Sequence, residues 1–128
     1  MRLRVTQPAG LFLEAETRMV QAEGMAGRFG LLPRHLDGAF ALSPGILRFE
    51  APDGTETFLA LDEGMLVKRG QDVLVAVRRA VRGDLGKLRQ SVEAMLEDAG
   101  ERERQARTAG ARLEAGFVRK MVGFGGHG

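Results

Sequence analysis

The stretch EGMAGRFGLLPRHLDGAFALSPGILRFE, from Glu23 to Glu50, decides the fold class of this chain of 128 residues. Glycine accepts backbone angles that other residues avoid, and proline fixes its own φ angle. Gly24, Gly30, Pro33 and Pro44 therefore indicate closely spaced turns. The apolar pieces between these turns are too short for a helix. The stretch predicts short strands joined by tight turns.

The same rhythm extends over the first two thirds of the chain. Apolar pieces of strand-like composition alternate with turn residues, and Pro52-Asp53-Gly54 has the composition of a hairpin turn. Segments 2–5, 11–13, 17–22, 56–61, 65–67 and 73–77 are predicted as strands outside the opening stretch, and segment 46–51 is a predicted strand at its end. We expect about eight to ten short strands before residue 83. Because a half-buried sheet needs a second apolar face to cover it, they should close into a β-sandwich or a flattened barrel.

The period of the sequence changes at Gly83. Asp84 is a predicted helix N-cap, and apolar residues then recur at steps of three and four. These residues are Leu85, Leu88, Val92, Met95 and Ala99. Asp98-Ala-Gly100 is predicted to end this helix, and a second helix should run from about residue 101 to 122. The predicted fold is mainly β with α: a β-sandwich domain over 1–83, an antiparallel helical hairpin over 84–122, and a flexible tail over 123–128.

Basic residues gather in the second predicted helix, although the formal net charge of the chain is only +2. They are Arg102, Arg104, Arg107, Arg112, Arg119 and Lys120. The first predicted helix is acidic on balance. Two helices of opposite sign attract each other and stay soluble, which is one explanation of this pattern. The other is that the basic helix binds an acidic surface on another protein.

The residue inventory argues against catalysis, metal binding and nucleic-acid binding. The chain has no cysteine, and its two histidines are His35 and His127, so no nucleophile–base arrangement or zinc spacing is present. Base-stacking aromatic residues are scarce beside the basic helix. No apolar run reaches the roughly twenty residues that cross a bilayer, and the N-terminus lacks the apolar core of a signal peptide. We predict no enzyme, no metal, no direct membrane insertion and a cytoplasmic location.

Four segments, in order, carry a resemblance to a known family. They are Glu23-Gly24 followed by Phe29-Gly30-Leu31-Leu32-Pro33-Arg34-His35, then Leu42-Ser43-Pro44-Gly45-Ile46-Leu47-Arg48, then Phe58-Leu59-Ala60 with Gly64-Met65-Leu66-Val67, and finally Ala80-Val81-Arg82-Gly83-Asp84-Leu85. Together they resemble the ε subunit of F-type ATP synthases over nearly the whole chain.

The resemblance implies a subunit of the central stalk and its partners. In the family, the β-sandwich is held by the γ subunit and touches the ring of c subunits, at the cytoplasmic face of the plasma membrane. The C-terminal hairpin can extend into the catalytic head of α and β subunits and block ATP hydrolysis, for which the basic helix is suited. The predicted partner-interface residues are Glu23, Met25, Arg28, Pro33, Arg34 and His35. For His35 the alternative is a loop-stabilising hydrogen bond.

Three departures from the family pattern qualify these expectations. The segment Met25–Arg28 makes a longer and more basic loop than is usual. Arg34 stands where glycine is usual, which resembles the alternate, sodium- or proton-linked ATPases of the family. Some members bind ATP through an [IL]-D-x-x-R-A motif, and here Gly86 and Gln90 replace its Asp and Ala, although Arg89 is kept. We predict no tight ATP site and no other cofactor.

A different interpretation of the same pattern is a small ligand- or carbohydrate-binding β-sandwich with a helical dimerisation hairpin. Such modules stack sugars on exposed aromatic residues. The chain has seven phenylalanines but no tryptophan or tyrosine, which argues against this alternative.

Overall fold

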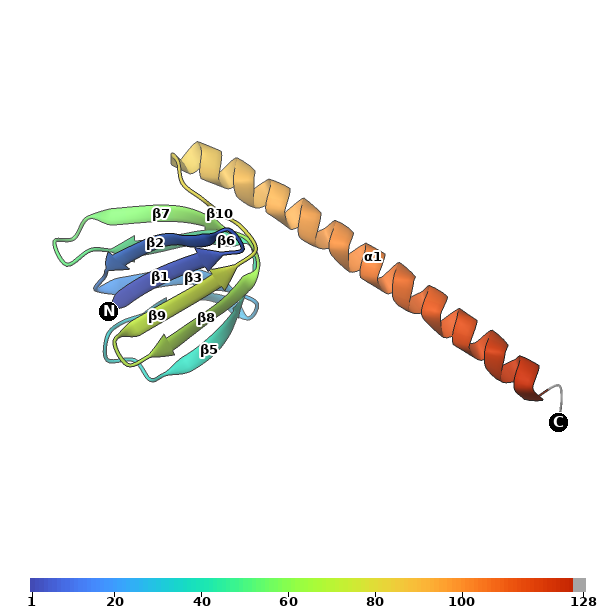
Figure 1. The fold of residues 1–128 in the computed structure, drawn as a ribbon. Coiled ribbons are helices and arrows are strands. Elements are labelled where there is room, and N and C mark those ends of the chain that lie inside the picture. Colours follow the sequence, from blue (N-terminus) through green and yellow to red (C-terminus); the bar gives the residue numbers. More distant parts are fainter. Residues whose placement is uncertain (126–128) are drawn as a thin grey trace. The chain divides into compact units, whose positions relative to one another are not determined.

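Ten strands are followed by one helix in the computed structural model, which describes the backbone of residues 1–125 and the side chains of residues 1–113 (Figure 1). The strands are β1 (Arg2–Gln7), β2 (Gly10–Glu16), β3 (Met19–Gly24), β4 (Gly27–Leu31), β5 (Gly38–Leu42), β6 (Gly45–Glu50), β7 (Glu56–Leu61), β8 (Gly64–Arg69), β9 (Asp72–Val77) and β10 (Ala80–Val81), and the helix is α1 (Leu85–Gly125). The prediction of a mainly β fold that begins with a β-sandwich is confirmed.

The strands form two layers. The first layer has the order β4-β3-β6-β7-β10, and the second has the order β5-β8-β9-β1-β2. Backbone pairing links the layers through β3 and β5, whose one registered pair is Gly24 with Leu42. All of the pairings are antiparallel except that of β1 with β9. The opening stretch of the sequence therefore supplies the strands that join one layer to the other.

The chain changes layer between β5 and β6. Ser43 N–H donates to the Glu23 carbonyl at 3.1 Å, and Met25 N–H donates to the Ala41 carbonyl at 3.0 Å. The end of β5 therefore still lies beside the end of β3. Pro44 has no N–H to continue the ladder. A Cβ on Gly45 would lie 2.5 Å from Glu23 Cγ, so glycine is required for this close approach.

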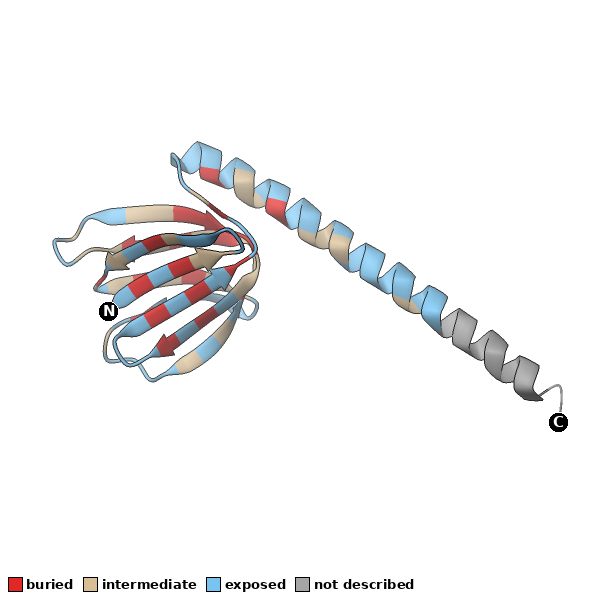
Figure 2. Ribbon diagram, viewed as in Figure 1, coloured by how far each residue is buried: buried red, intermediate tan, exposed pale blue. Residues whose placement is uncertain are grey.

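The core lies between the two layers and follows the alternation of the strands. Figure 2 shows buried and exposed residues alternating along β1 and β9. Leucine, valine and phenylalanine side chains from both layers meet in one cluster, which includes Leu3, Val5, Val20, Leu47, Phe49, Leu59, Leu66, Val73 and Val75. Side chains of this kind contribute about 1.5–3 kcal/mol each when fully buried, so this cluster is the main source of stability.

The start of α1 covers the outer face of the first layer. Asp84 caps the helix, as predicted, because its Oδ1 accepts the Lys87 N–H at 2.9 Å. Leu88 and Met95 are fully buried beside Ala60 of β7. Partly buried residues complete this second cluster: Ile46, Phe58, Val81 and Val92. Part of the predicted apolar stripe thus packs on β6, β7 and β10.

The predicted helical hairpin is wrong, because α1 is a single helix of 41 residues. Asp98-Ala-Gly100 stays helical. A glycine inside a helix costs only about 1 kcal/mol relative to alanine, and α1 contains no proline to remove a backbone hydrogen bond. The chain forms two compact units, Met1–Leu96 and Glu97–Gly128. Residues 126–128 of the predicted tail lie outside the described residues.

Replacing Gly64 with alanine should destabilise the sandwich. A Cβ at this position would lie 2.0 Å from the Ala76 carbonyl oxygen, and this neighbour is backbone that cannot turn away. We expect a loss of about 1–3 kcal/mol in the free energy of unfolding, measured by chemical denaturation. Gly30→Ala is the matched control, since the nearest atom to its Cβ would be 3.9 Å away. Equal stability of the two variants would contradict this account of Gly64.

Candidate functional site

An apolar face covers the outer side of the second layer. It is built by six residues on β5, β8 and β9, all of them exposed: Ala39, Ala41, Met65, Val67, Leu74 and Ala76. Strand register places them in two rows, because Ala39 pairs with Val67 and Val67 with Leu74, while Ala41 pairs with Met65 and Met65 with Ala76. We call these six residues the apolar face.

The sequence leaves this surface without polar side chains. In most two-layer antiparallel folds, one face of each sheet is apolar and the other is polar and meets water. Here Met65–Val67 and Val73–Val77 are unbroken apolar runs, so both sides of the sheet become apolar. Met65 and Leu74 remain 45% and 42% exposed. A contiguous apolar patch of this kind is typical of a protein–protein contact.

Charged residues border the apolar face on β1 and β2. Arg4 pairs in register with Leu74 on one side and with Glu14 on the other. Glu14 Oε1 accepts from Arg2 Nε at 2.5 Å and lies 3.4 Å from Arg4 Nη2. The hydrogen bond from Arg2 holds the pKa of the Glu14 carboxyl below its usual range. The row of Leu74 therefore ends at ion-paired residues, as an interface core ends at its polar rim, whereas the row of Met65 continues in register to Thr6 and the exposed Leu11.

The turn between β3 and β4 extends the apolar face beyond β5. Met25 stands at this turn and is 76% exposed, and its N–H bonds to β5. Arg28 Nε donates to Glu23 Oε1 at 3.0 Å, so these two predicted interface residues pair with each other. Phe29 and Phe40 stack with ring centroids 4.7 Å apart. The turn and β5 together line an open hollow of about 400 Å³.

The other predicted interface residues lie in the loop between β4 and β5. His35 N–H donates to the Leu32 carbonyl at 3.0 Å, and Leu32 N–H donates to His35 Nδ1 at 3.2 Å. With Nδ1 as acceptor, the neutral ring carries its proton on Nε2. Pro33 and Arg34 lie between these two bonded residues. Leu36, which sequence reasoning did not select, is 89% exposed.

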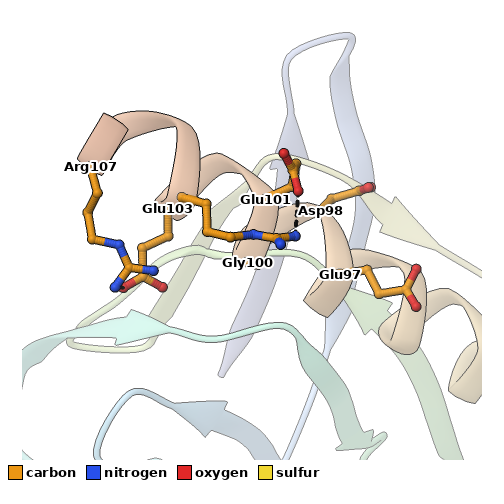
Figure 3. Close-up of a pocket in the computed structure, with 7 residues that line it drawn as sticks. Glu97, Asp98, Gly100, Glu101, Glu103 and Arg107 are labelled. Atoms are coloured by element: carbon orange, nitrogen blue, oxygen red, sulfur yellow. Dashed lines mark hydrogen bonds and ion pairs between the residues drawn. The ribbon is translucent and has the colours of Figure 1, made fainter. Parts of the chain in front are cut away.

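The basic residues of the predicted regulatory helix are partly paired along α1. Arg104 Nη2 lies 2.5 Å from Glu101 Oε2, and Arg107 Nη1 lies 3.8 Å from Glu103 Oε1; Figure 3 labels Glu101, Glu103 and Arg107 on this part of the helix. Arg112 is exposed, Arg102 is partly exposed, and Arg119 and Lys120 lie outside the residues whose side chains are described. Exposed ion pairs of this type contribute about 0.2–1 kcal/mol, so their arginines can exchange partners at little cost.

The described residues contain no group of three or more His, Cys, Asp or Glu side chains placed to hold a metal ion. Within that same part of the chain, no helix has the length and apolar character to cross a membrane.

Comparison with known proteins identifies the family. Residues 1–83 match the family model described as the β-sandwich domain of the ATP synthase delta/epsilon chain. The chain belongs to this ATP synthase family. It is 38% identical over 125 residues to an ATP synthase epsilon chain 2 of Cereibacter sphaeroides, a match covering 95% of this chain and 86% of the relative. An ATP synthase epsilon chain 2 of Paraburkholderia xenovorans is 33% identical, with 97% and 91% covered.

Solved ATP synthase structures share the fold. A chain in the mitochondrial ATP synthase of Euglena gracilis, solved as OSCP/F1/c-ring, superposes with a TM-score of 0.61 at 24% identity over 72% of this chain and 61% of that one. A chain in the central stalk/c-ring structure of the Tetrahymena thermophila enzyme superposes with a TM-score of 0.55 at 12% identity, over 77% of this chain and 95% of that one.

The family assignment confirms the prediction of an ε chain that is a non-catalytic subunit of an ATP synthase. It also decides against a carbohydrate-binding module. Sequence reasoning missed the apolar face, although the unbroken apolar runs of β8 and β9 were a signal for it. It also missed that Lys68 of β8 is buried. The signal was its position two places after Leu66, because residues two apart on a strand face the same side.

Proposed function

We propose that the chain is the ε subunit of the central stalk and that its apolar face binds the γ subunit. The observation that carries this proposal is the exposed set of six apolar residues on three adjacent strands. A subunit that stays bound through many rotations needs a stable contact. Lasting interfaces are more apolar than transient ones, which favours γ as the occupant of this face.

The Met25 turn and the loop after β4 are proposed to face the ring of c subunits. Hydrogen bonds hold both segments to β5 and β8. The Met25 N–H donates to the Ala41 carbonyl of β5, and Lys68 Nζ of β8 donates to the His35 carbonyl. Two exposed apolar side chains, Met25 and Leu36, accompany Arg28 and Arg34 there. Together these side chains can make both apolar contacts and hydrogen bonds with the loops of a neighbouring subunit. In the assembled enzyme, the chain would lie peripherally at the cytoplasmic face of the plasma membrane.

Placing a charge on the apolar face should weaken γ binding without unfolding the chain. Met65→Glu introduces a carboxylate at the centre of one row, where docking would bury it unpaired. We expect at least a hundredfold lower affinity for purified γ subunit, measured by calorimetry, with little change in the unfolding temperature.

Leu85→Glu is the control for this experiment. Leu85 is 43% exposed, close to the 45% of Met65, and begins α1, whose first turns cover the other layer. Its substitution should leave the affinity within about threefold of that of the original chain. Normal γ binding by a folded Met65→Glu variant would show that another surface holds γ.

We further propose that α1 beyond Leu96 is the regulatory element and that it opposes ATP hydrolysis through contacts with the catalytic α and β subunits. The element proposed here begins later than the predicted boundary at residue 84, because Leu88 and Met95 pack with the sandwich strands. The continuous helix supports an extended state that can reach a partner.

Deleting residues 97–128 should raise the ATPase activity of the assembled complex. A cut after Leu96 keeps the cover over Ile46 and Ala60, so the sandwich stays intact. We expect a severalfold increase in the hydrolysis rate with unchanged assembly. The triple substitution of Arg104, Arg107 and Arg112 by glutamate should reproduce much of this increase if charge carries the contact. Unchanged hydrolysis in the deletion complex would rule out inhibition by this segment.

We also propose that the chain has no tight ATP site. Gly86 and Gln90, both exposed in the first turns of α1, stand where the ATP-binding motif has Asp and Ala. Calorimetry of the isolated chain with Mg-ATP should therefore give no binding at micromolar concentrations. The double variant Gly86→Asp/Gln90→Ala tests the motif from the other direction and should bind more tightly. Micromolar binding by the original chain would contradict the proposal.

A further inference from the structure

A lysine is buried inside the second layer. Lys68 lies at an inward position of β8, paired in register with the buried Val73 of β9, and is 2% exposed. Its Nζ donates to the His35 carbonyl at 2.5 Å and to the Gly70 carbonyl at 3.0 Å. Asp37 Oδ1 lies 4.0 Å from the same nitrogen. This one ammonium group therefore joins the loop between β4 and β5 to the turn between β8 and β9.

The surrounding groups compensate the cost of burying this charge. An ammonium group in a protein interior is tolerated when carbonyl oxygens and an anion surround it. Asp37 has a second role, because its Oδ1 also accepts the Gly70 N–H at 2.8 Å. Gly70 adopts a φ of 59°, the left-handed region that favours glycine. A side chain of each segment therefore bonds to the backbone of the other, Lys68 to His35 and Asp37 to Gly70.

The loop that Lys68 holds carries three of the predicted interface residues and the exposed Leu36. An exposed loop of this length normally samples many conformations, and ordering it on binding costs conformational entropy. An attachment that already exists in the free chain lowers this cost. We propose that Lys68 is a positioning residue that holds the loop 32–37 in the form that docks on the rotor. This inference rests on the proposed function of the loop as a c-ring contact.

The test replaces Lys68 with methionine, which keeps an unbranched apolar stem and removes the charge. Hydrogen exchange of the isolated chain should be at least tenfold faster at the amides of Leu32 and His35, which are hydrogen-bonded within the loop, and tryptic cleavage after Arg34 should be faster. Asp37→Asn keeps an oxygen for the Gly70 N–H but removes the charge, so its effect should be smaller and of the same kind. Leu47→Val, in the core of β6, is the control for a general loss of stability.

Affinity is then measured for a detergent-solubilised complex of γ with the c ring. Lys68→Met should bind at least tenfold more weakly than Leu47→Val, with Asp37→Asn between them. Unchanged exchange in Lys68→Met would overturn the positioning role. Faster exchange with unchanged affinity would overturn the link between loop order and docking.

Leu36→Glu changes an exposed side chain of the loop and leaves the Lys68 network intact, so its affinity for the same complex reports separately on whether the loop docks on the ring. Normal binding by Leu36→Glu would contradict the proposed c-ring contact, whereas weaker binding by Leu36→Glu with normal binding by Lys68→Met would contradict only the positioning role.

Discussion

The pairing of β3 with two strands of different layers is the constraint on which the rest of the fold depends. β3 pairs with β6 in the first layer, and its last residue, Gly24, pairs with Leu42 of β5 in the second layer. A ladder can change partner only where one strand ends and another begins, and Pro44 with Gly45 provides this break. The change of layer sends β5 to the edge of the second layer, where it adds Ala39 and Ala41 to the two rows of the apolar face.

The outer faces of the two layers differ in how they are covered. On the first layer, Leu88 and Met95 of α1 lie over Ala60 and bury it completely. On the second layer, Met65 and Leu74 remain exposed. Each sheet is apolar on both sides over part of its surface, which is unusual for antiparallel sheets. The chain covers the outer face of the first layer with its own helix. The apolar face of the second layer is best explained by a second subunit that covers it.

Local patterns in the sequence predicted the elements that depend on local chemistry. Turn residues and short apolar pieces predicted the strands, and Asp84 predicted the helix start, because N-cap bonding depends only on neighbouring residues. The apolar runs of β8 and β9 indicate strands that are apolar on both sides, but they do not indicate which side stays exposed. Whether a residue such as Leu74 faces a partner or the core depends on which layer its strand joins. That placement results from long-range pairing, which strand periodicity alone does not specify.

Lys68 illustrates a second limit of sequence reasoning. A lysine beside Arg69 at the end of a strand has the composition of a solvated turn, since lysine is almost never fully buried without partners. Its partners here are carbonyls of His35 and Gly70, and backbone groups leave no signal in the side-chain pattern. Asp37 is separated from Lys68 by the whole of β5, β6 and β7, so only the folded structure brings the two together.

The error at Asp98–Gly100 has an energetic origin that also bears on function. A break there would lose a few helical hydrogen bonds, each with a net contribution of about 0.5–1.5 kcal/mol. A hairpin would recover part of this by packing its two halves, but between residue 100 and Leu113 the only apolar side chains are alanines such as Ala106 and Ala109. Keeping Gly100 inside the helix costs only about 1 kcal/mol relative to alanine, which accounts for the unbroken helix. The ion pairs of Arg104 and Arg107 are exposed on this helix, so the helix loses little when these arginines turn to acidic groups elsewhere.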